Sequence, residues 1–117
     1  MPRVPRKQQW AEEASYQVMD GGHNREAVFG DDADRGHFVR LLGRYRQWFG
    51  FRLYHYCLMD NHFHLLLQLQ EPRHLSPLLA GLLRAYVHHF HRRHRFVGHL
   101  WQGRFKTPPT MLPDGLR

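Results

Sequence analysis

The residues of this chain best suited to chemistry are two histidines, His62 and His64, separated by a single phenylalanine. They begin an apolar run that continues through three leucines, a composition typical of a β-strand. Because successive side chains of a strand point to opposite faces, both imidazole rings are predicted to lie on the same face. Two neutral imidazoles on one rigid face can bind a single divalent metal ion. The chain contains 11 histidines, so the residues around this pair must decide whether it is a metal site.

A β-hairpin is predicted to position the pair. Its strands are residues 51–59 and 62–69, and Asp60 and Asn61 between them tolerate the positive φ angles of a tight turn. The resulting register pairs Met59 with His62, Cys57 with His64, and His55 with Leu66. One face then carries the histidines and their polar neighbours: His55, Cys57, Met59, His62, His64 and Gln68. The opposite face is apolar and is predicted to face the core: Tyr54, Tyr56, Leu58, Phe63, Leu65 and Leu67.

The remaining segments predict an α+β fold. Residues 16–19 form a short strand, and a helix capped by Asp31 or Asp32 continues to Gly50. A second helix is predicted to be capped by Ser76, opened by Pro77 and ended by Gly98, and a fourth strand follows at His99–Lys106. The order β-α-β-β-α-β is that of a ferredoxin-like antiparallel sheet with both helices on one face.

Composition limits the classes of partner. At 117 residues the chain is expected to form one domain, and its net charge of +7 predicts a polyanionic partner, with nucleic acid first. A ribosomal or membrane-surface protein would carry the same charge. The single cysteine excludes an intrachain disulfide and fits a reducing cytoplasm. No apolar stretch reaches the roughly 20 residues of a membrane span, and the basic first residues do not form a signal peptide.

The segment Met59-Asp60-Asn61-His62-Phe63-His64-Leu65-Leu66 resembles the His-hydrophobe-His motif of enzymes that nick single-stranded DNA. The resemblance is strongest to the REP-associated tyrosine transposases, within the IS200-like transposase family. It extends over residues 14–106 through several further segments: Asn24-Arg25, Val28-Phe29, Asp31 to Asp34, Tyr56 to Met59, Tyr86, Phe90, Arg92-Arg93, Gly98 and Leu100 to Lys106.

The resemblance implies that His62 and His64 bind a divalent metal ion, Mg²⁺ or Mn²⁺, and that Asn61 shapes the turn before them. It also implies a substrate of hairpin or single-stranded DNA, which is nicked and rejoined in DNA transposition. A third protein ligand is normally needed, and His55, diagonal to His64, is the same-face candidate, although an exposed strand histidine is the simpler interpretation. A zinc site that includes Cys57 is an alternative, but one cysteine favours a small buried hydrophobe.

In the family the nucleophile is a tyrosine on a later helix, in a Tyr-Ile-x-x-Asn-Pro context that this sequence does not match. Residues 107–117 contain no tyrosine and are expected to form an irregular tail from truncation or a frameshift, just as residues 1–13 are expected to form a flexible basic segment. Tyr86 is the weak stand-in, and its packing role is favoured. Two hypotheses stay open: a transposase whose tyrosine comes from another chain or reading frame, and a catalytically inactive DNA-binding remnant.

The predicted DNA contacts combine positive charge with a ring that can stack on a base. They are Asn61, Arg92, Arg93, Arg95, Trp101, Arg104 and Lys106. For the arginines of the second helix the alternative is a solvated helix end, and for Trp101 it is packing at the edge of the core. Arg40, Arg44 and Arg46 of the first helix are interpreted as a solvated face. A homodimer is left open, and an RNA-binding or ribosome-associated domain would explain the charge but not the paired histidines.

Overall fold

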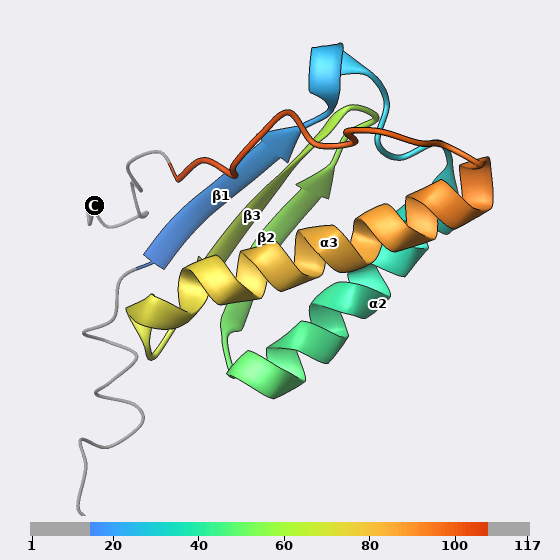
Figure 1. Ribbon diagram of the computed structural model, residues 1–117. Helices are drawn as coiled ribbons and strands as arrows, with labels where there is room; N and C mark the ends of the chain where they lie inside the picture. Colours follow the sequence, from blue (N-terminus) through green and yellow to red (C-terminus); the bar gives the residue numbers. More distant parts are fainter. Residues whose placement is uncertain (1–14, 108–117) are drawn as a thin grey trace, which may run out of the picture.

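Three segments of alternating polar and apolar residues form one antiparallel sheet, and two amphipathic helices cover one of its faces (Figure 1). The structure is a computed structural model that describes residues 15–107. The predictions for residues 1–13 and 108–117 therefore lie outside the described residues. The elements in chain order are β1 (Ser15–Gly21), η1 (His23–Arg25), α2 (Asp32–Phe49), β2 (Arg52–Leu58), β3 (His62–Gln68), η2 (Pro72–His74) and α3 (Leu75–His94).

The strand order is β1-β3-β2, so the strand that carries both histidines lies in the centre of the sheet. The predicted hairpin register is confirmed, because Cys57 pairs with His64 and His55 pairs with Leu66. On β3 the predicted alternation also holds: Phe63, Leu65 and Leu67 are buried beneath the helices. His62 and His64 consequently lie on the face away from the helices, which we call the histidine face.

Two details of the hairpin differ from the prediction. The register shifts between Leu53 and His55, so Tyr54 does not face the core; it is exposed, and its hydroxyl donates a 2.6 Å hydrogen bond to Gln68 Oε1. The turn residues Asp60 and Asn61 do not have positive φ angles. The turn is held instead by the loop before α2, whose Val28 and Phe29 amides both donate to the Asp60 carbonyl oxygen.

The first helix begins and ends as its sequence predicts. Asp31 caps α2 by accepting a hydrogen bond from the Asp34 amide, and Gly50 ends it at a φ of 69°. The second helix begins differently, because η2 leads directly into α3 with His74 at the N-cap, so Ser76 lies inside the helix and makes no cap. At its other end α3 stops at Arg95, which has a φ of 53°, three residues before Gly98.

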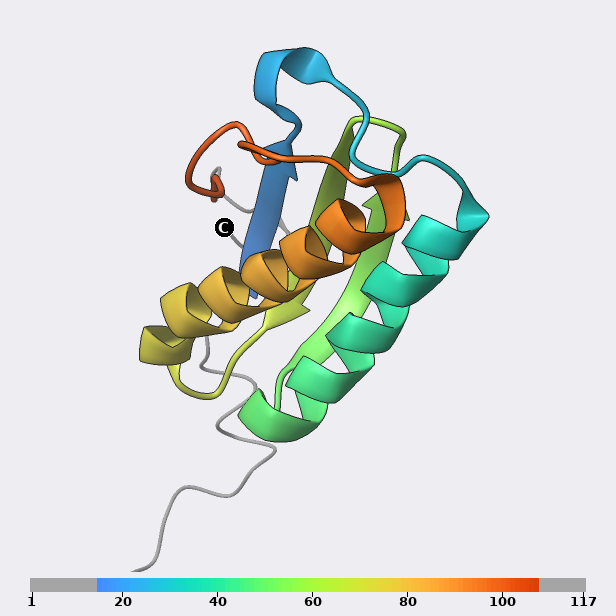
Figure 2. The same ribbon diagram turned by 45° about the vertical axis from the view of Figure 1, so that its right-hand side comes forward.

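The predicted fourth strand is present only as two isolated bridges. Lys106 pairs with Met19 of β1, and Trp101 pairs with Gly22 just after β1, both antiparallel. The segment therefore lies along the expected edge of the sheet without forming a continuous ladder. Figures 1 and 2 show it crossing from the end of α3 to the outer side of β1. The α+β class and the arrangement of a ferredoxin-like sheet are confirmed, with this one edge irregular.

Trp101 and Tyr86 belong to the core between sheet and helices. Trp101 is 8% exposed, its ring packs on Phe63 and Tyr86, and its Nε1–H donates to the Leu83 carbonyl oxygen at 3.2 Å. The expected stacking of Trp101 on a DNA base does not agree with this burial, because the ring packs on two core rings and its nitrogen already has a backbone partner. Its role in the structure is packing.

Candidate metal and DNA site at the histidine end of the sheet

The paired histidines lie side by side on the histidine face. Their ring centroids are 5.1 Å apart, and both side chains are partly exposed. Partial burial lowers the pKa of His64, and the nearby His62 and His55 lower it further. His64 is therefore neutral at pH 7, which leaves a ring nitrogen lone pair available to a metal ion.

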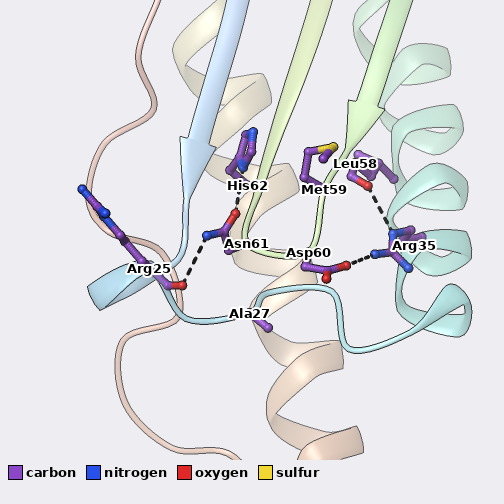
Figure 3. A pocket seen from close by; sticks show the side chains of 8 residues that line it. All are labelled: Arg25, Ala27, Arg35, Leu58, Met59, Asp60, Asn61 and His62. Atoms are coloured by element: carbon purple, nitrogen blue, oxygen red, sulfur yellow. Dashed lines mark hydrogen bonds and ion pairs between the residues drawn. The ribbon is translucent and has the colours of Figure 1, made fainter.

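Asn61 fixes the orientation of His62. Its Oδ1 lies 2.8 Å from His62 Nδ1, so the amide oxygen accepts a hydrogen bond from that nitrogen and leaves Nε2 for a ligand. The Asn61 Nδ2 donates at 3.3 Å to the carbonyl oxygen of Arg25, and the Asn61 carbonyl oxygen accepts from the Gly22 amide at 2.9 Å. Figure 3 shows this chain of contacts from the η1 turn to the imidazole. The predicted role of Asn61 in the turn is thus extended to positioning a histidine.

Two adjoining hollows meet at this end of the sheet. The larger, of about 580 Å³, is lined by the hairpin turn, Arg25, Ala27 and Arg35, and includes His62 (Figure 3). The smaller, of about 340 Å³, adds Gly21, Gly22 and Gln102. Arg25, Asn61 and His62 line both hollows. The Arg25 side chain is exposed, so a cation and an imidazole border the same open space.

Gly22 permits this close arrangement of β1, η1 and the hairpin turn. A Cβ atom built on Gly22 would lie 2.0 Å from the Glu26 carbonyl oxygen, a contact that no side chain could make. The backbone of Gly22 itself bonds to Asn61 and pairs with Trp101. Glycine is needed at this position because three chain segments approach it closely.

No third protein ligand joins the pair within residues 15–107. No group of three His, Cys, Asp or Glu side chains in this range is placed to hold a metal ion, so His55 does not complete a site with His62 and His64. The Cys57 thiol lies 3.5 Å from Met59 Sδ, and Asp60 forms an ion pair with Arg35. Two imidazoles alone suit an ion whose remaining positions are filled by ligand oxygens and water.

None of the tyrosines is placed to act as a nucleophile at this pair. Tyr86 is fully buried, its hydroxyl donates a 2.5 Å hydrogen bond to the Val28 carbonyl oxygen, and burial together with the charge of Asp34 raises its pKa. Tyr54 bonds to Gln68, four residues along β3 from His64, and Tyr56 pairs with Leu65 on the helix side. The packing role favoured for Tyr86 agrees with its position. The two remaining tyrosines, Tyr16 and Tyr45, pack against the core.

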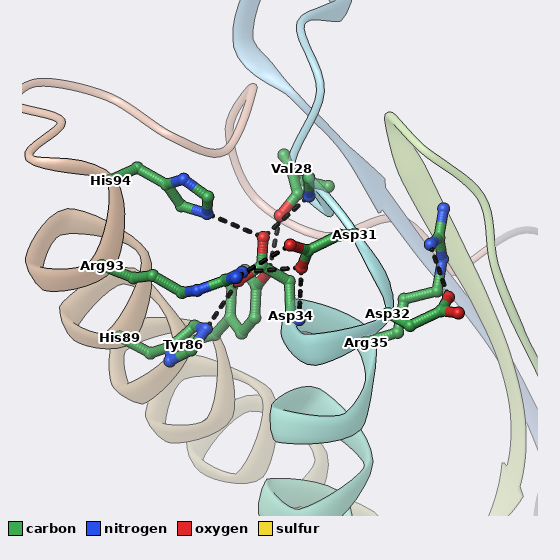
Figure 4. A network of polar contacts seen from close by, with 10 residues as sticks. Val28, Asp31, Asp32, Asp34, Arg35, Tyr86, His89, Arg93 and His94 are labelled. Atoms are coloured by element: carbon green, nitrogen blue, oxygen red, sulfur yellow. Dashed lines mark hydrogen bonds and ion pairs between the residues drawn. The ribbon is translucent and has the colours of Figure 1, made fainter.

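Arg93 belongs to an ion-pair cluster at the junction of α2 and α3 (Figure 4). Its guanidinium donates to both Asp31 oxygens at 2.6 and 2.8 Å and to Asp34 at 2.9 Å. Asp34 is fully buried and also accepts from His89 and His94, each at 2.8 Å. Arg93 therefore has a structural role at the junction of the helices, and its predicted DNA contact stays a prediction.

The other predicted cations divide between two surfaces. Lys106 pairs with Met19, which in turn pairs with His64, so Lys106 lies on the same row of the sheet as the histidine. Arg104 is exposed on the same edge segment. Arg92 and Arg95 are exposed at the end of α3, in the helical layer.

Three residues with a role in this region were not predicted from the sequence: Arg25, Arg35 and Asp34. The Asp34 cluster had a recognisable signal, because an aspartate caps α2, two more lie in its first turn, and α3 ends in histidines and arginines. Antiparallel helices bring such ends together. Arg25 and Arg35 had none, because they meet the hairpin turn only in the fold: the Arg25 carbonyl oxygen accepts from Asn61, and Arg35 donates to the Leu58 carbonyl oxygen.

Neither α2 nor α3 is long and apolar enough to cross a membrane, and the described residues contain no longer helix.

Comparison with known proteins identifies the family. Residues 11–110 match the family model described as "Transposase IS200 like". A crystal structure of a candidate transposase from Deinococcus radiodurans R1 shares the fold with a TM-score of 0.66 and 19% identity, over 94% of this chain and 86% of that one. A REP-associated tyrosine transposase bound to a REP hairpin aligns with a TM-score of 0.59 and 13% identity. That alignment covers 94% of this chain but only 64% of the other, and no functionally curated protein matches. Since the family model covers most of the sequence, the chain belongs to the IS200-like transposase family.

Proposed function

We propose that the histidine end of the sheet binds hairpin or single-stranded DNA and holds one of its phosphates beside His62 and His64 with a divalent metal ion. Membership of the transposase family supports DNA as the partner, as does the net charge of +7. Among solved structures of the same fold, one is a REP-associated tyrosine transposase bound to a REP hairpin. A short hairpin with a single-stranded flank is therefore the substrate to test first.

The observation that carries the proposal is the pair of adjacent imidazoles, one of which, His62, lines a hollow that Arg25 also borders. His62 and His64 would hold Mn²⁺ or Mg²⁺, and Mn²⁺ accepts imidazole more readily than Mg²⁺ does. The bound ion would polarise a phosphate oxygen. The chain itself contributes the rigid strand that carries the rings, the Asn61 contact that orients His62, and the low pKa of His64 that keeps it neutral.

Lys106 and Arg104 are proposed to contact the DNA backbone next to this pair. Both are exposed on the segment that lies beside β1 at the edge of the sheet. Lys106 pairs with Met19, which pairs with His64 on the next strand. Exposed cations beside a metal-bound phosphate would neutralise further phosphates and hold the strand along the sheet edge. Arg25 extends this positive border to the other side of His62.

Nicking in this class of reaction needs a tyrosine hydroxyl that attacks the phosphate, forms a 5′-phosphotyrosine bond and releases a 3′-hydroxyl. The burial of Tyr86 and its bond to Val28 favour a second candidate function for the chain alone, namely DNA binding without cleavage. A tyrosine supplied by a second chain would restore the first function at the same pair of histidines.

The test compares a hairpin that carries a single-stranded flank with the same hairpin without the flank, each with and without Mn²⁺. We expect the flank to increase affinity, and Mn²⁺ to increase it further only when the flank is present. His64→Ala should abolish the Mn²⁺-dependent part, whereas His99→Ala, an exposed histidine that belongs to neither α2 nor α3, should keep it. Equal affinity for both hairpins in the wild type, with no effect of Mn²⁺, would overturn the proposal.

A further inference from the structure

We infer that the outer surface of the two helices is a second DNA-binding surface, which holds the sugar-phosphate backbone of duplex DNA apart from the strand at His62 and His64. We call it the helical arginine patch, and its members are Arg40, Arg44, Arg84, His88 and Arg92. The inference rests on the proposed function for the identity of the polyanion, but on different residues.

The patch is a cationic surface without compensating acids. All carboxylates of α2 lie in its first turn, and α3 contains none. Asp34 is taken up by His89, Arg93 and His94, and Asp32 by Arg35. Within residues 15–107, no carboxylate forms an ion pair with the four arginines of the patch, and all four are exposed: Arg40, Arg44, Arg84 and Arg92. An ordinary solvated helix face intersperses both signs of charge, which this surface does not.

The charges of the patch repel one another. Arg40 and Arg44 are one turn apart on α2, and Arg84, His88 and Arg92 repeat at intervals of four residues along α3. Like charges at this spacing destabilise a helix. Between the rows, His37 stacks on His89 with ring centroids 3.9 Å apart and planes 10° from parallel. Partial burial lowers the pKa of His37, and the charges of His89, Arg40, Arg44 and Arg92 lower it further, which shows that both helices contribute to one positive field.

The patch is separate from the histidine site. Both helices lie on one face of the sheet (Figures 1 and 2), and His62 and His64 point from the other face. A short DNA strand bound at the paired histidines cannot reach the outer surface of the helices without passing round the sheet. The patch therefore requires a further stretch of the same DNA or a second DNA segment.

The arrangement of the patch fits a duplex backbone. At a rise of about 1.5 Å per residue, Arg40 and Arg44 are separated by about 6 Å along their helix, and Arg84 and Arg92 by about 12 Å. The phosphates of each duplex strand advance about 3.4 Å along the axis per nucleotide, so each row of cations spans the axial advance of roughly two to four phosphates. Arginine, rather than lysine, occupies the patch, and its planar guanidinium binds phosphate through two parallel hydrogen bonds.

The experiment measures hairpin affinity as a function of salt concentration. In the triple variant Arg40→Gln, Arg44→Gln, Arg92→Gln, the plot of log affinity against log salt should become less steep by about two to three units, because each lost phosphate contact removes about 0.9. The single variant Arg44→Gln should remove about 0.9, and its matched control is Arg73→Gln, an exposed arginine of η2 that pairs with Glu71. Lengthening the duplex stem should strengthen binding by the wild type but not by the triple variant.

The outcomes separate this inference from the proposed function. If the triple variant keeps the wild-type slope and stem-length dependence, the helical arginine patch is not a DNA surface, whatever happens at His64. If the slope falls while the gain from the flank and Mn²⁺ persists, the patch and the histidine site are independent surfaces, as inferred. Stronger binding of duplex RNA than duplex DNA, lost in the triple variant, would assign the patch to RNA and overturn the choice of DNA. Failure of the wild type to bind any hairpin would overturn both.

Discussion

Replacement of Asp34 by asparagine should destabilise the fold more than any other single change of charge in the helices. The Asp34 carboxylate is fully buried and accepts hydrogen bonds from His89, His94, Arg93 and the Gly30 amide. Removing one partner of a buried ion pair costs about 3–5 kcal/mol. Arg93 keeps both bonds to Asp31, so we expect the lower end, about 3 kcal/mol. At about 4–8 °C per kcal/mol for a domain of this size, the melting temperature should fall by roughly 12–24 °C.

The same substitution should change the dependence of stability on pH. Burial alone would raise the pKa of Asp34, but the hydrogen bonds from His89, His94, Arg93 and Gly30 lower it to about 2. A carboxyl group whose pKa is lower in the folded state stabilises the fold above its unfolded pKa of about 4, and this stabilisation is lost as the pH falls toward 2. The melting temperature of the wild type should therefore decline between about pH 4 and pH 2, and that of Asp34→Asn should decline less.

The assay is thermal unfolding followed by circular dichroism across this pH range. Asp32→Asn is the matched control, because Asp32 lies in the same helical turn, is fully exposed and forms an ion pair with Arg35. Such an exposed pair contributes about 0–1 kcal/mol. If Asp34→Asn were as stable as Asp32→Asn at pH 7, or kept the acid-dependent decline of the wild type, the buried cluster would not have the role described here.

Three further expectations concern Gly22, the buried carboxylate of Asp20 and the nucleophile. Gly22→Ala should destabilise the fold in denaturant unfolding, because its Cβ would lie 2.0 Å from the Glu26 carbonyl oxygen. Gly43→Ala is the control: a Cβ there would meet nothing within 4 Å, so it should stabilise α2 by about 0.5–1 kcal/mol. Equal effects of the two substitutions would refute this role of Gly22. Burial raises the pKa of Asp20, although the Gly21 amide and Lys106 oppose this effect. Asp20→Asn should therefore raise the melting temperature at pH 7, and this gain should disappear below about pH 4. A lower melting temperature of the variant at pH 7 would contradict this expectation. With a labelled hairpin and Mn²⁺ or Mg²⁺, the chain alone should form no covalent 5′-phosphotyrosine adduct on a denaturing gel, and an adduct lost in Tyr86→Phe would show that the buried tyrosine reacts.

The hairpin could be predicted in detail because one face of β3 is a row of large apolar residues. A shift of one residue would expose Leu65 and bury His64, so burial of the leucines alone determines the register. The shift beside Tyr54 could not be predicted in the same way. It depends on a hydrogen bond to Gln68 on the neighbouring strand, and an exposed tyrosine fits either face.

Residues distant in sequence account for most of what the sequence did not reveal. Trp101 has neighbours typical of a DNA-binding segment, but in the fold its ring fills the space between Phe63 and Tyr86. From the sequence, Arg93 is interpreted as a cation at a solvated helix end. In the fold, α2 places Asp31 and Asp34 beside it. The paired histidines could be found because their geometry is local to one strand, whereas their contact through Asn61 to Arg25 is not.

The central claim, that His62 and His64 form a metal site completed by a DNA phosphate, is tested most directly by titrating the protein with Mn²⁺ in the presence and absence of a flanked hairpin. Because the chain supplies two imidazoles and no third ligand within the described residues, we predict weak Mn²⁺ binding without DNA. Affinity for Mn²⁺ should rise when DNA is bound, and both the weak binding and the rise should disappear in His64→Ala. Tight Mn²⁺ binding without DNA that is unchanged in His64→Ala would contradict the account.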